Sequence, residues 1–143
     1  MTVKAILDEK GYDVVTVAPE QTLADAARKL SEHGIGAVVI ADADRRIHGI
    51  LSERDIVRAL ASEGVEAMEK PISAFMTSAV QVCSESSTVN EVMRVMTNGR
   101  FRHLPVARDG RLIGIVSIGD VVKRRLEEVE REAEEIRTYI ATA

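Results

Sequence analysis

The chain has 143 residues, enough for one ordinary domain or for two half-sized units that share a core, and 45% of its residues are hydrophobic. A formal net charge of -4 argues against binding to duplex DNA or to an anionic membrane surface, since both need clustered basic residues. Aromatic residues make up 3% of the chain, which argues against a surface that stacks single-stranded bases.

The N-terminal segment, residues 1–13, reaches charged residues within a few positions and has no apolar run of seven residues. This pattern is neither that of a secretory signal nor that of a membrane anchor, so we expect a cytoplasmic protein. Cys83 is the single cysteine and cannot form an internal disulfide. Because His33, His48 and His103 are scattered along the sequence, we expect no metal site.

The first predicted unit, residues 14–61, begins with a short strand at 14–17 and continues with a helix after Thr22. This helix has one apolar face, because apolar residues recur at the spacing i, i+3, i+4, i+7. They are Leu23, Ala26, Ala27 and Leu30. The helix opens with Thr-x-x-Asp, a capping box in which a hydroxyl and a carboxylate satisfy free backbone donors.

Two further strands are expected in this unit, at 35–40 and 47–51, joined by a polar turn at 42–46. A second helix follows from Ser52. The unit therefore has the order β-α-β-β-α.

The same order recurs at residues 79–126, after a connector at 62–78. The strands of this second unit are expected at 79–82, 101–106 and 112–116. A sheet of three short strands with two helices on one face leaves its other face uncovered. Pairing two such units about a pseudo-twofold axis covers both sheets, so we predict an α/β (α+β) fold of two repeats with a helical extension at the C-terminus.

The C-terminal tail, residues 127–143, continues the last helix without Gly or Pro. From Val122 onward, apolar residues of this helix recur at alternating steps of four and three, as in the a/d seam of a coiled coil. They are Val122, Leu126, Val129, Ala133, Ile136 and Ile140. The seam is shorter than a secure coiled coil requires, so the helix either packs on a partner subunit or folds back on its own domain. We expect the former, in a homodimer.

Two stretches share a glycine, a serine and an aspartate at equal spacing: GILSERDIV at 49–57 and GIVSIGDVV at 114–122. The tandem β-α-β-β-α repeat that ends in Gly-apolar-apolar-Ser-x-x-Asp resembles a pair of cystathionine beta-synthase (CBS) domains, the Bateman module. The lead-in at 71–77 is also of the kind found in that family. The resemblance covers roughly residues 14–126 and implies a regulatory protein that binds an adenine nucleotide in the cleft between its repeats.

The resemblance further implies that each repeat offers an aspartate to the ribose, Asp55 or Asp120, and a serine to the phosphate, Ser52 or Ser117. The chemistry of these residues agrees with those roles, because backbone N–H groups at a helix start attract phosphate and a carboxylate accepts hydrogen bonds from both ribose hydroxyls. Ser-x-x-Asp before an apolar run is also the pattern of an ordinary helix cap, and this alternative stays open.

We expect the stronger site at Asp120, where Arg100 and Arg102 on or beside the partnered strand can neutralise a phosphate. At Asp55 the intervening pair is Glu53 and Arg54, so one charge opposes a phosphate and the other favours it. The small Gly36 and Ala37 leave room there for a base or for a dinucleotide such as NAD or NADH. The further contacts expected for the adenine are Val38, Thr77, His103, Leu104, Pro105, Ile118 and Gly119.

We therefore expect a ligand-sensing module that binds AMP, with ADP, ATP or NAD(H) as alternative ligands, and that signals to an effector protein in trans. The alternative is a structural or interaction adaptor whose clefts stay empty. We do not expect an enzyme, because no nucleophile lies at motif spacing from a base and no Gly-rich lysine loop is present to hold a transferable phosphate.

Overall fold

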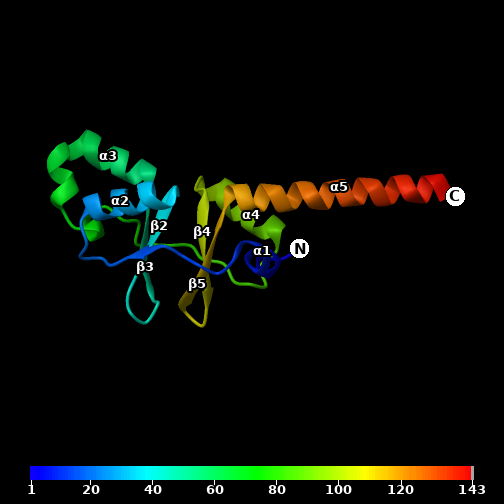
Figure 1. Cartoon of the computed structure of the whole chain (residues 1–143), viewed down its shortest axis with the longest axis horizontal. Helices are drawn as coiled ribbons and strands as arrows, with labels where there is room; N and C mark the ends of the chain where they lie inside the picture. Colours follow the sequence, from blue (N-terminus) through cyan, green and yellow to red (C-terminus); the bar gives the residue numbers. More distant parts are fainter. Residues whose placement is uncertain (143) are drawn as a thin grey trace.

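Two small sheets, one from each half of the chain, form the centre of the computed structural model, which describes residues 1–142 (Figure 1). The first sheet has the order β1 (Thr16–Val17), β2 (Ala37–Ala41), β3 (Ile47–Ser52). In it β1 runs parallel to β2, and β2 runs antiparallel to β3. The second sheet is an antiparallel pair, β4 (His103–Arg108) and β5 (Arg111–Ser117).

Helices α2 (Leu23–His33) and α3 (Glu53–Glu63) pack on one face of the first sheet. The predicted capping box opens α2, since the backbone N–H of Thr22 donates to Asp25 Oδ2 at 3.0 Å and the N–H of Asp25 donates to Thr22 Oγ1 at 3.2 Å. Gly34 ends the helix in the left-handed conformation. The apolar face of α2 is buried against β2 and β3, as its periodicity predicts.

Helices α4 (Val89–Gly99) and α5 (Ile118–Thr142) pack on the second sheet in the same way. A further helix, α1 (Val3–Lys10), joins them and buries Val3, Ile6 and Leu7 completely or nearly so. In the first half the connector takes this place, with two 3-10 turns, η1 (Val65–Glu69) and η2 (Ile72–Ala74), packed on the core. The N-terminal segment, to which the sequence analysis assigned no element, therefore completes the core of the second half.

The two sheets pack on each other through β2 and β5. In β2, Val38 and Ile40 point to the helices of their own half, while Val39 and Ala41 contact Leu112 of the other half. All five residues of β2 are buried for this reason, because both of its faces are covered. The predicted fold class, two α/β repeats that share a core, is confirmed.

The strand expected at 79–82 does not form. The next residue, Cys83, does pair with the second sheet, where its N–H donates to the carbonyl of Pro105 at 3.0 Å and its own carbonyl accepts from the N–H of Ala107 at 2.9 Å. The preceding residues Ala79, Val80 and Gln81 line the cleft between the halves instead. The first strand is also shorter than expected, at Thr16–Val17.

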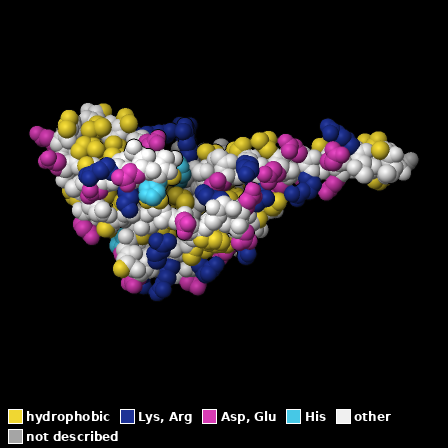
Figure 2. Space-filling view, viewed as in Figure 1, with side chains coloured by type: hydrophobic (Ala, Val, Ile, Leu, Met, Phe, Trp, Pro, Cys, Tyr) yellow, Lys and Arg dark blue, Asp and Glu magenta, His cyan; other side chains and the backbone are white. Residues whose placement is uncertain are grey.

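The last helix, α5, runs without interruption through the predicted boundary at residue 126 and projects from the body of the protein (Figures 1 and 2). Its predicted seam is largely exposed, with Ile136 60% and Ile140 69% accessible to solvent. Up to residue 142, the tail does not fold back on its own domain. Residue 143, the last of that tail, lies outside the described residues.

The glycines of the two repeated motifs each lie under a neighbouring segment, as expected for positions that need a close approach. A Cβ on Gly49 would lie 2.6 Å from Met76 Sδ, and a Cβ on Gly114 would lie 2.9 Å from both methyl carbons of Leu7. By contrast, a Cβ on Gly119 would meet only Ser117 Oγ, at 3.6 Å.

We predict that Gly114→Ala lowers the free energy of unfolding by roughly 1 to 3 kcal/mol, because its methyl group overpacks the contact with Leu7. Gly119→Ala is the matched control and is expected to raise the free energy of unfolding by up to about 1 kcal/mol, because alanine favours a helix. Urea unfolding of both variants tests this prediction. Equal effects of the two substitutions would contradict the close packing of α1 on β5.

Candidate functional site

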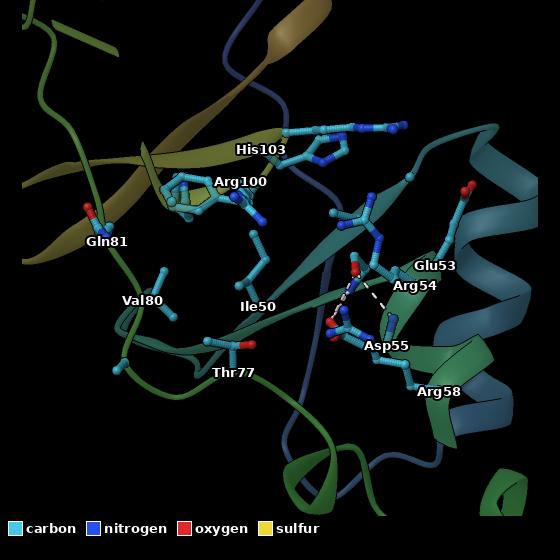
Figure 3. A pocket seen from close by; sticks show the side chains of 18 residues that line it. Ile50, Glu53, Arg54, Asp55, Arg58, Thr77, Val80, Gln81, Arg100 and His103 are labelled. Atoms are coloured by element: carbon cyan, nitrogen blue, oxygen red, sulfur yellow. Dashed lines mark hydrogen bonds between the residues drawn. The ribbon is translucent and has the colours of Figure 1, made fainter. Parts of the chain in front are cut away.

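A cleft of about 660 Å³ lies between the two halves of the protein (Figure 3). Its walls come from β3 and the start of α3, from the end of the connector, and from the segment that joins α4 to β4. This volume lies within the usual range of small-ligand sites. The cleft is therefore large enough for a small organic ligand.

Ser52 and Asp55 line one wall of the cleft, at the junction where β3 ends and α3 begins. Asp55 Oδ2 accepts hydrogen bonds from the backbone N–H of Ser52 at 2.8 Å and from the Ser52 hydroxyl at 3.1 Å. In return Ser52 Oγ accepts from the N–H of Asp55 at 3.3 Å. The pair is thus a complete helix cap, yet Asp55 Oδ1 takes part in none of these bonds.

Four arginines line the same cleft, two on α3 and two just before β4. They are Arg54, Arg58, Arg100 and Arg102. The carboxylates of the lining residues are those of Glu53 and Asp55. Within residues 1–142, none of the four arginines forms an ion pair with an acid. The cleft therefore carries an excess of unpaired positive charge, which suits an anionic ligand.

Arg100 has a left-handed backbone conformation, and the residue at the equivalent position of the first half is a glycine, Gly34. Arg100 ends α4 with φ 56° and ψ 40°, and Gly34 ends α2 with φ 61° and ψ 40°. For a residue other than glycine, this left-handed conformation costs about 1 kcal/mol of conformational free energy. Strain of this kind is concentrated at functional sites, and here it places an arginine at the cleft.

His103 lines the cleft and is half-buried. Its burial lowers the pKa of the imidazole, and the nearby positive charge of Lys10 lowers that pKa further. His103 is therefore neutral at physiological pH and can both donate and accept a hydrogen bond. A Cβ on Gly36 would lie 3.2 Å from His103 Cε1, so part of the room left by this glycine is taken by the imidazole.

Asp120 lies outside this cleft, and so do Ser117, Ile118 and Gly119. Asp120 Oδ2 accepts from the N–H of Ser117 at 2.8 Å and from Lys10 Nζ at 2.7 Å. Partial burial by itself raises the pKa of this carboxyl group, but the hydrogen bonds from Lys10 and Ser117 outweigh it and hold the pKa below its usual value.

The structure therefore divides the residues that the sequence analysis placed together. Arg100, Arg102 and His103 line the cleft of Asp55 and Ser52, across from the first motif, whereas Asp120 pairs with a lysine of α1. Of the other expected contacts, Gly36, Ala37, Arg54, Thr77 and Pro105 line the cleft. Val38 and Leu104 are buried in the two cores instead.

Sequence reasoning missed several residues of the cleft, among them Arg58, Val80, Gln81 and Phe101. Arg58 could have been found, because it lies four residues after Arg54 on the same face of α3. Val80 and Gln81 carried no such signal, since they were assigned to a strand that does not form.

No helix within residues 1–142 combines the length and the apolar character needed to span a bilayer. The family model of the CBS domain matches residues 3–62 and 72–127, which together make up most of the chain. An uncharacterized 17.7 kDa protein of Acidianus ambivalens is 36% identical over 87% of this chain and 77% of its own length.

Solved structures show the same relationship. The CBS-domain containing protein ATU1752 from Agrobacterium tumefaciens is 50% identical, with a TM-score of 0.84 over 87% of this chain and 99% of that one. The CBS domain pair of protein MJ0100, solved in complex with 5'-methylthioadenosine and S-adenosyl-L-methionine, is 28% identical, with a TM-score of 0.79 over 90% and 98% of the two chains. The chain therefore belongs to the CBS domain family, of which it contains a tandem pair.

Proposed function

We propose that this CBS pair is a regulatory module that binds an adenosine-containing nucleotide in the cleft at Asp55. The observation that carries the proposal is the convergence on one cleft of four arginines that form no ion pair within residues 1–142. The same cleft presents Asp55 Oδ1, which takes no part in the helix cap. A nucleotide combines the two groups that this arrangement suits, an anionic phosphate and a ribose diol.

The ribose and the phosphate have separate partners in this arrangement. Asp55 Oδ1 accepts hydrogen bonds from the ribose hydroxyls, while Oδ2 keeps the cap of α3 intact. The phosphate faces Arg100 and Arg102 on one side and the N-terminus of α3 on the other. Ile50, Val80 and Pro105 offer apolar surface to the base.

The known ligands of a relative support the adenosine part of this proposal. The CBS pair of MJ0100 was solved with two adenosine compounds, 5'-methylthioadenosine and S-adenosyl-L-methionine. The first lacks a phosphate and the second carries a positive sulfonium group. Neither therefore offers a phosphate that could form ion pairs with a cluster of arginines. The four arginines here favour AMP, or the related ADP, ATP and NAD(H), over those two compounds.

The role we propose is regulatory and not catalytic. The Ser52 hydroxyl is engaged in the helix cap, where it donates to Asp55 and accepts from the N–H of the same residue. Because the cleft lies between the two halves, a bound nucleotide contacts both of them and stabilises one arrangement of the pair. We propose that an effector protein recognises this arrangement.

We predict that a nucleotide raises the melting temperature of the protein by an amount on the order of 10 °C at about 100 times its Kd, because it binds the folded state alone. Thermal melting of ligand-free protein is measured with AMP, ADP, ATP, NAD, NADH, 5'-methylthioadenosine and S-adenosyl-L-methionine. Asp55→Asn is expected to weaken binding about tenfold or more, since it removes an ionised acceptor.

The matched control for this experiment is Asp44→Asn, which makes the same change at an exposed turn outside the cleft. This variant is expected to bind as the unmodified protein does. If no compound in the series shifts a cooperative melting transition, the nucleotide proposal fails and the adaptor with empty clefts becomes the better account.

We predict that Arg100→Gly makes the protein more stable and a weaker binder at the same time. Glycine relieves the left-handed strain and should raise the free energy of unfolding by roughly 0.5 to 1 kcal/mol, while loss of the guanidinium should weaken AMP binding about tenfold or more. Urea unfolding and calorimetric titration measure the two effects.

Arg45→Gly is the control, because Arg45 also has a positive φ of 64° but stands in the turn between β2 and β3. It should stabilise the fold without changing affinity for AMP. Unchanged affinity in Arg100→Gly would remove Arg100 from the proposed site.

We also propose that the chain forms a homodimer along α5. Exposed apolar residues on this helix support the proposal, because several lie in the part of α5 that projects from the body of the protein, whose backbone Figure 1 shows. They include Leu126, Val129, Ile136, Tyr139 and Ile140.

We predict that Ile136→Glu converts a dimer into a monomer in sedimentation equilibrium, because it places a charge in the apolar stripe. Thr138→Glu adds the same charge to another face of α5 and should leave the dimer intact. A monomeric unmodified protein, or a dimer that survives Ile136→Glu, would contradict this proposal.

A further inference from the structure

Lys10 reaches from the last turn of α1 to the aspartate of the second repeated motif. Its ammonium donates to Asp120 Oδ2 at 2.7 Å and to the carbonyl oxygen of Ile115 at 3.1 Å. The pair is partly shielded from solvent, with 34% of the Lys10 side chain and 24% of the Asp120 side chain exposed. Asp120 is thus already engaged by a cation from the same chain.

Within residues 1–142, the aspartate of the first motif forms no ion pair with a cation. Ile50 follows the motif glycine as Ile115 does in the second half, and its carbonyl accepts from the N–H of Thr77 at 3.0 Å. The backbone of the connector therefore supplies the hydrogen bond to the carbonyl oxygen of Ile50, and Asp55 is left facing the cleft. In the second half the side chain of Lys10 donates to the carbonyl oxygen of Ile115 and also pairs with the aspartate, Asp120.

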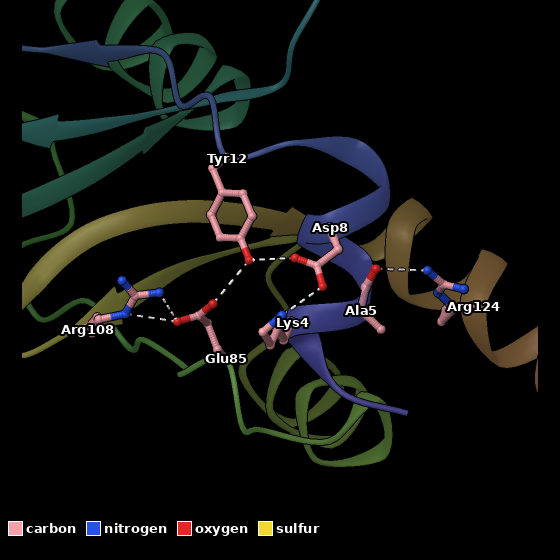
Figure 4. A network of polar contacts seen from close by, with 7 residues as sticks. All are labelled: Lys4, Ala5, Asp8, Tyr12, Glu85, Arg108 and Arg124. Carbon is pink, nitrogen blue, oxygen red and sulfur yellow. Dashed lines mark hydrogen bonds and ion pairs between the residues drawn. The ribbon is translucent and has the colours of Figure 1, made fainter.

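The position of Lys10 is fixed because α1 is anchored on both sides. Its apolar face is buried, with Leu7 packed against Gly114. On the polar side Tyr12 donates to Asp8 at 2.9 Å and to Glu85 at 3.1 Å (Figure 4). From α5, Arg124 donates to the carbonyl of Ala5 at 2.9 Å.

The exposed polar contacts of α1 are individually weak, but the buried residues beneath them make the helix part of the core. Lys10 is therefore carried by a structural element and not by a free chain end. An ammonium at hydrogen-bonding distance from a carboxylate makes a stronger contact than a neutral hydroxyl does. Lys10 contacts Oδ2, the oxygen that also accepts from the N–H of Ser117, so its ammonium neutralises the carboxylate and stands beside the Oδ1 that a ribose would need.

We propose that Lys10 closes the nucleotide site of the second repeat by holding its ammonium against the carboxylate of Asp120, so that each chain binds one nucleotide, in the cleft at Asp55. This inference rests on the proposed function of that cleft. The two repeats then have different tasks, because the first binds the ligand through its motif and the second uses the same motif to hold α1.

Calorimetric titration of the full chain with AMP tests the closure. The unmodified protein should bind one AMP per chain, and Lys10→Met should bind two, because it frees Asp120 without adding a charge. The double variant Lys10→Met/Asp120→Asn should return to one. Lys4→Met makes the same change on a largely exposed lysine of α1 and should bind one AMP as well.

A neutral polar variant, Lys10→Gln, accompanies Lys10→Met in case the latter unfolds, and both are first checked by thermal melting. The closure would be overturned if the unmodified protein bound two AMP molecules per chain, or if folded Lys10→Met and folded Lys10→Gln each bound one. Either result would leave the proposed function of the cleft standing. No AMP binding by the unmodified protein or by either Lys10 variant would overturn both.

Discussion

The contact between the two sheets is the constraint on which the rest of the structure depends. Each half places its two helices on one face of a small sheet, and the other face would be left in water without a partner. Val39 and Ala41 of β2 meet Leu112 of β5 and cover both exposed faces. The cleft exists because the two halves meet, so the packing that stabilises the fold also creates the site.

The two halves share a motif but differ in what lies against it. Both aspartates cap a helix through the N–H of a serine at 2.8 Å, so the cap accounts for one oxygen of each carboxylate. Around Asp55 the cleft carries Glu53 and four arginines that form no ion pair within residues 1–142, whereas Asp120 forms an ion pair with Lys10. One duplicated motif therefore supports a ligand site in one half and a structural contact in the other.

Local patterns predicted the fold well, because capping and apolar periodicity act over a few residues. The capping boxes that open α2 at Thr22 and α4 at Thr88, and the alternating burial along β5, follow from such patterns. The neighbours of Asp120 could not be predicted in this way, since Lys10 lies 110 positions away and α1 carried no signal that linked it to β5. The strand predicted at 79–82 was wrong, because Ala79, Val80 and Gln81 line the cleft instead of pairing with β4.

The most direct test of this account is a crystal structure of the protein grown with AMP. The account predicts density for one nucleotide per chain, with its ribose at Asp55, its phosphate at Arg100 and Arg102, and the contact between Lys10 and Asp120 intact. Density at Asp120 with Lys10 displaced, or a cleft at Asp55 that stays empty under saturating AMP, would contradict it.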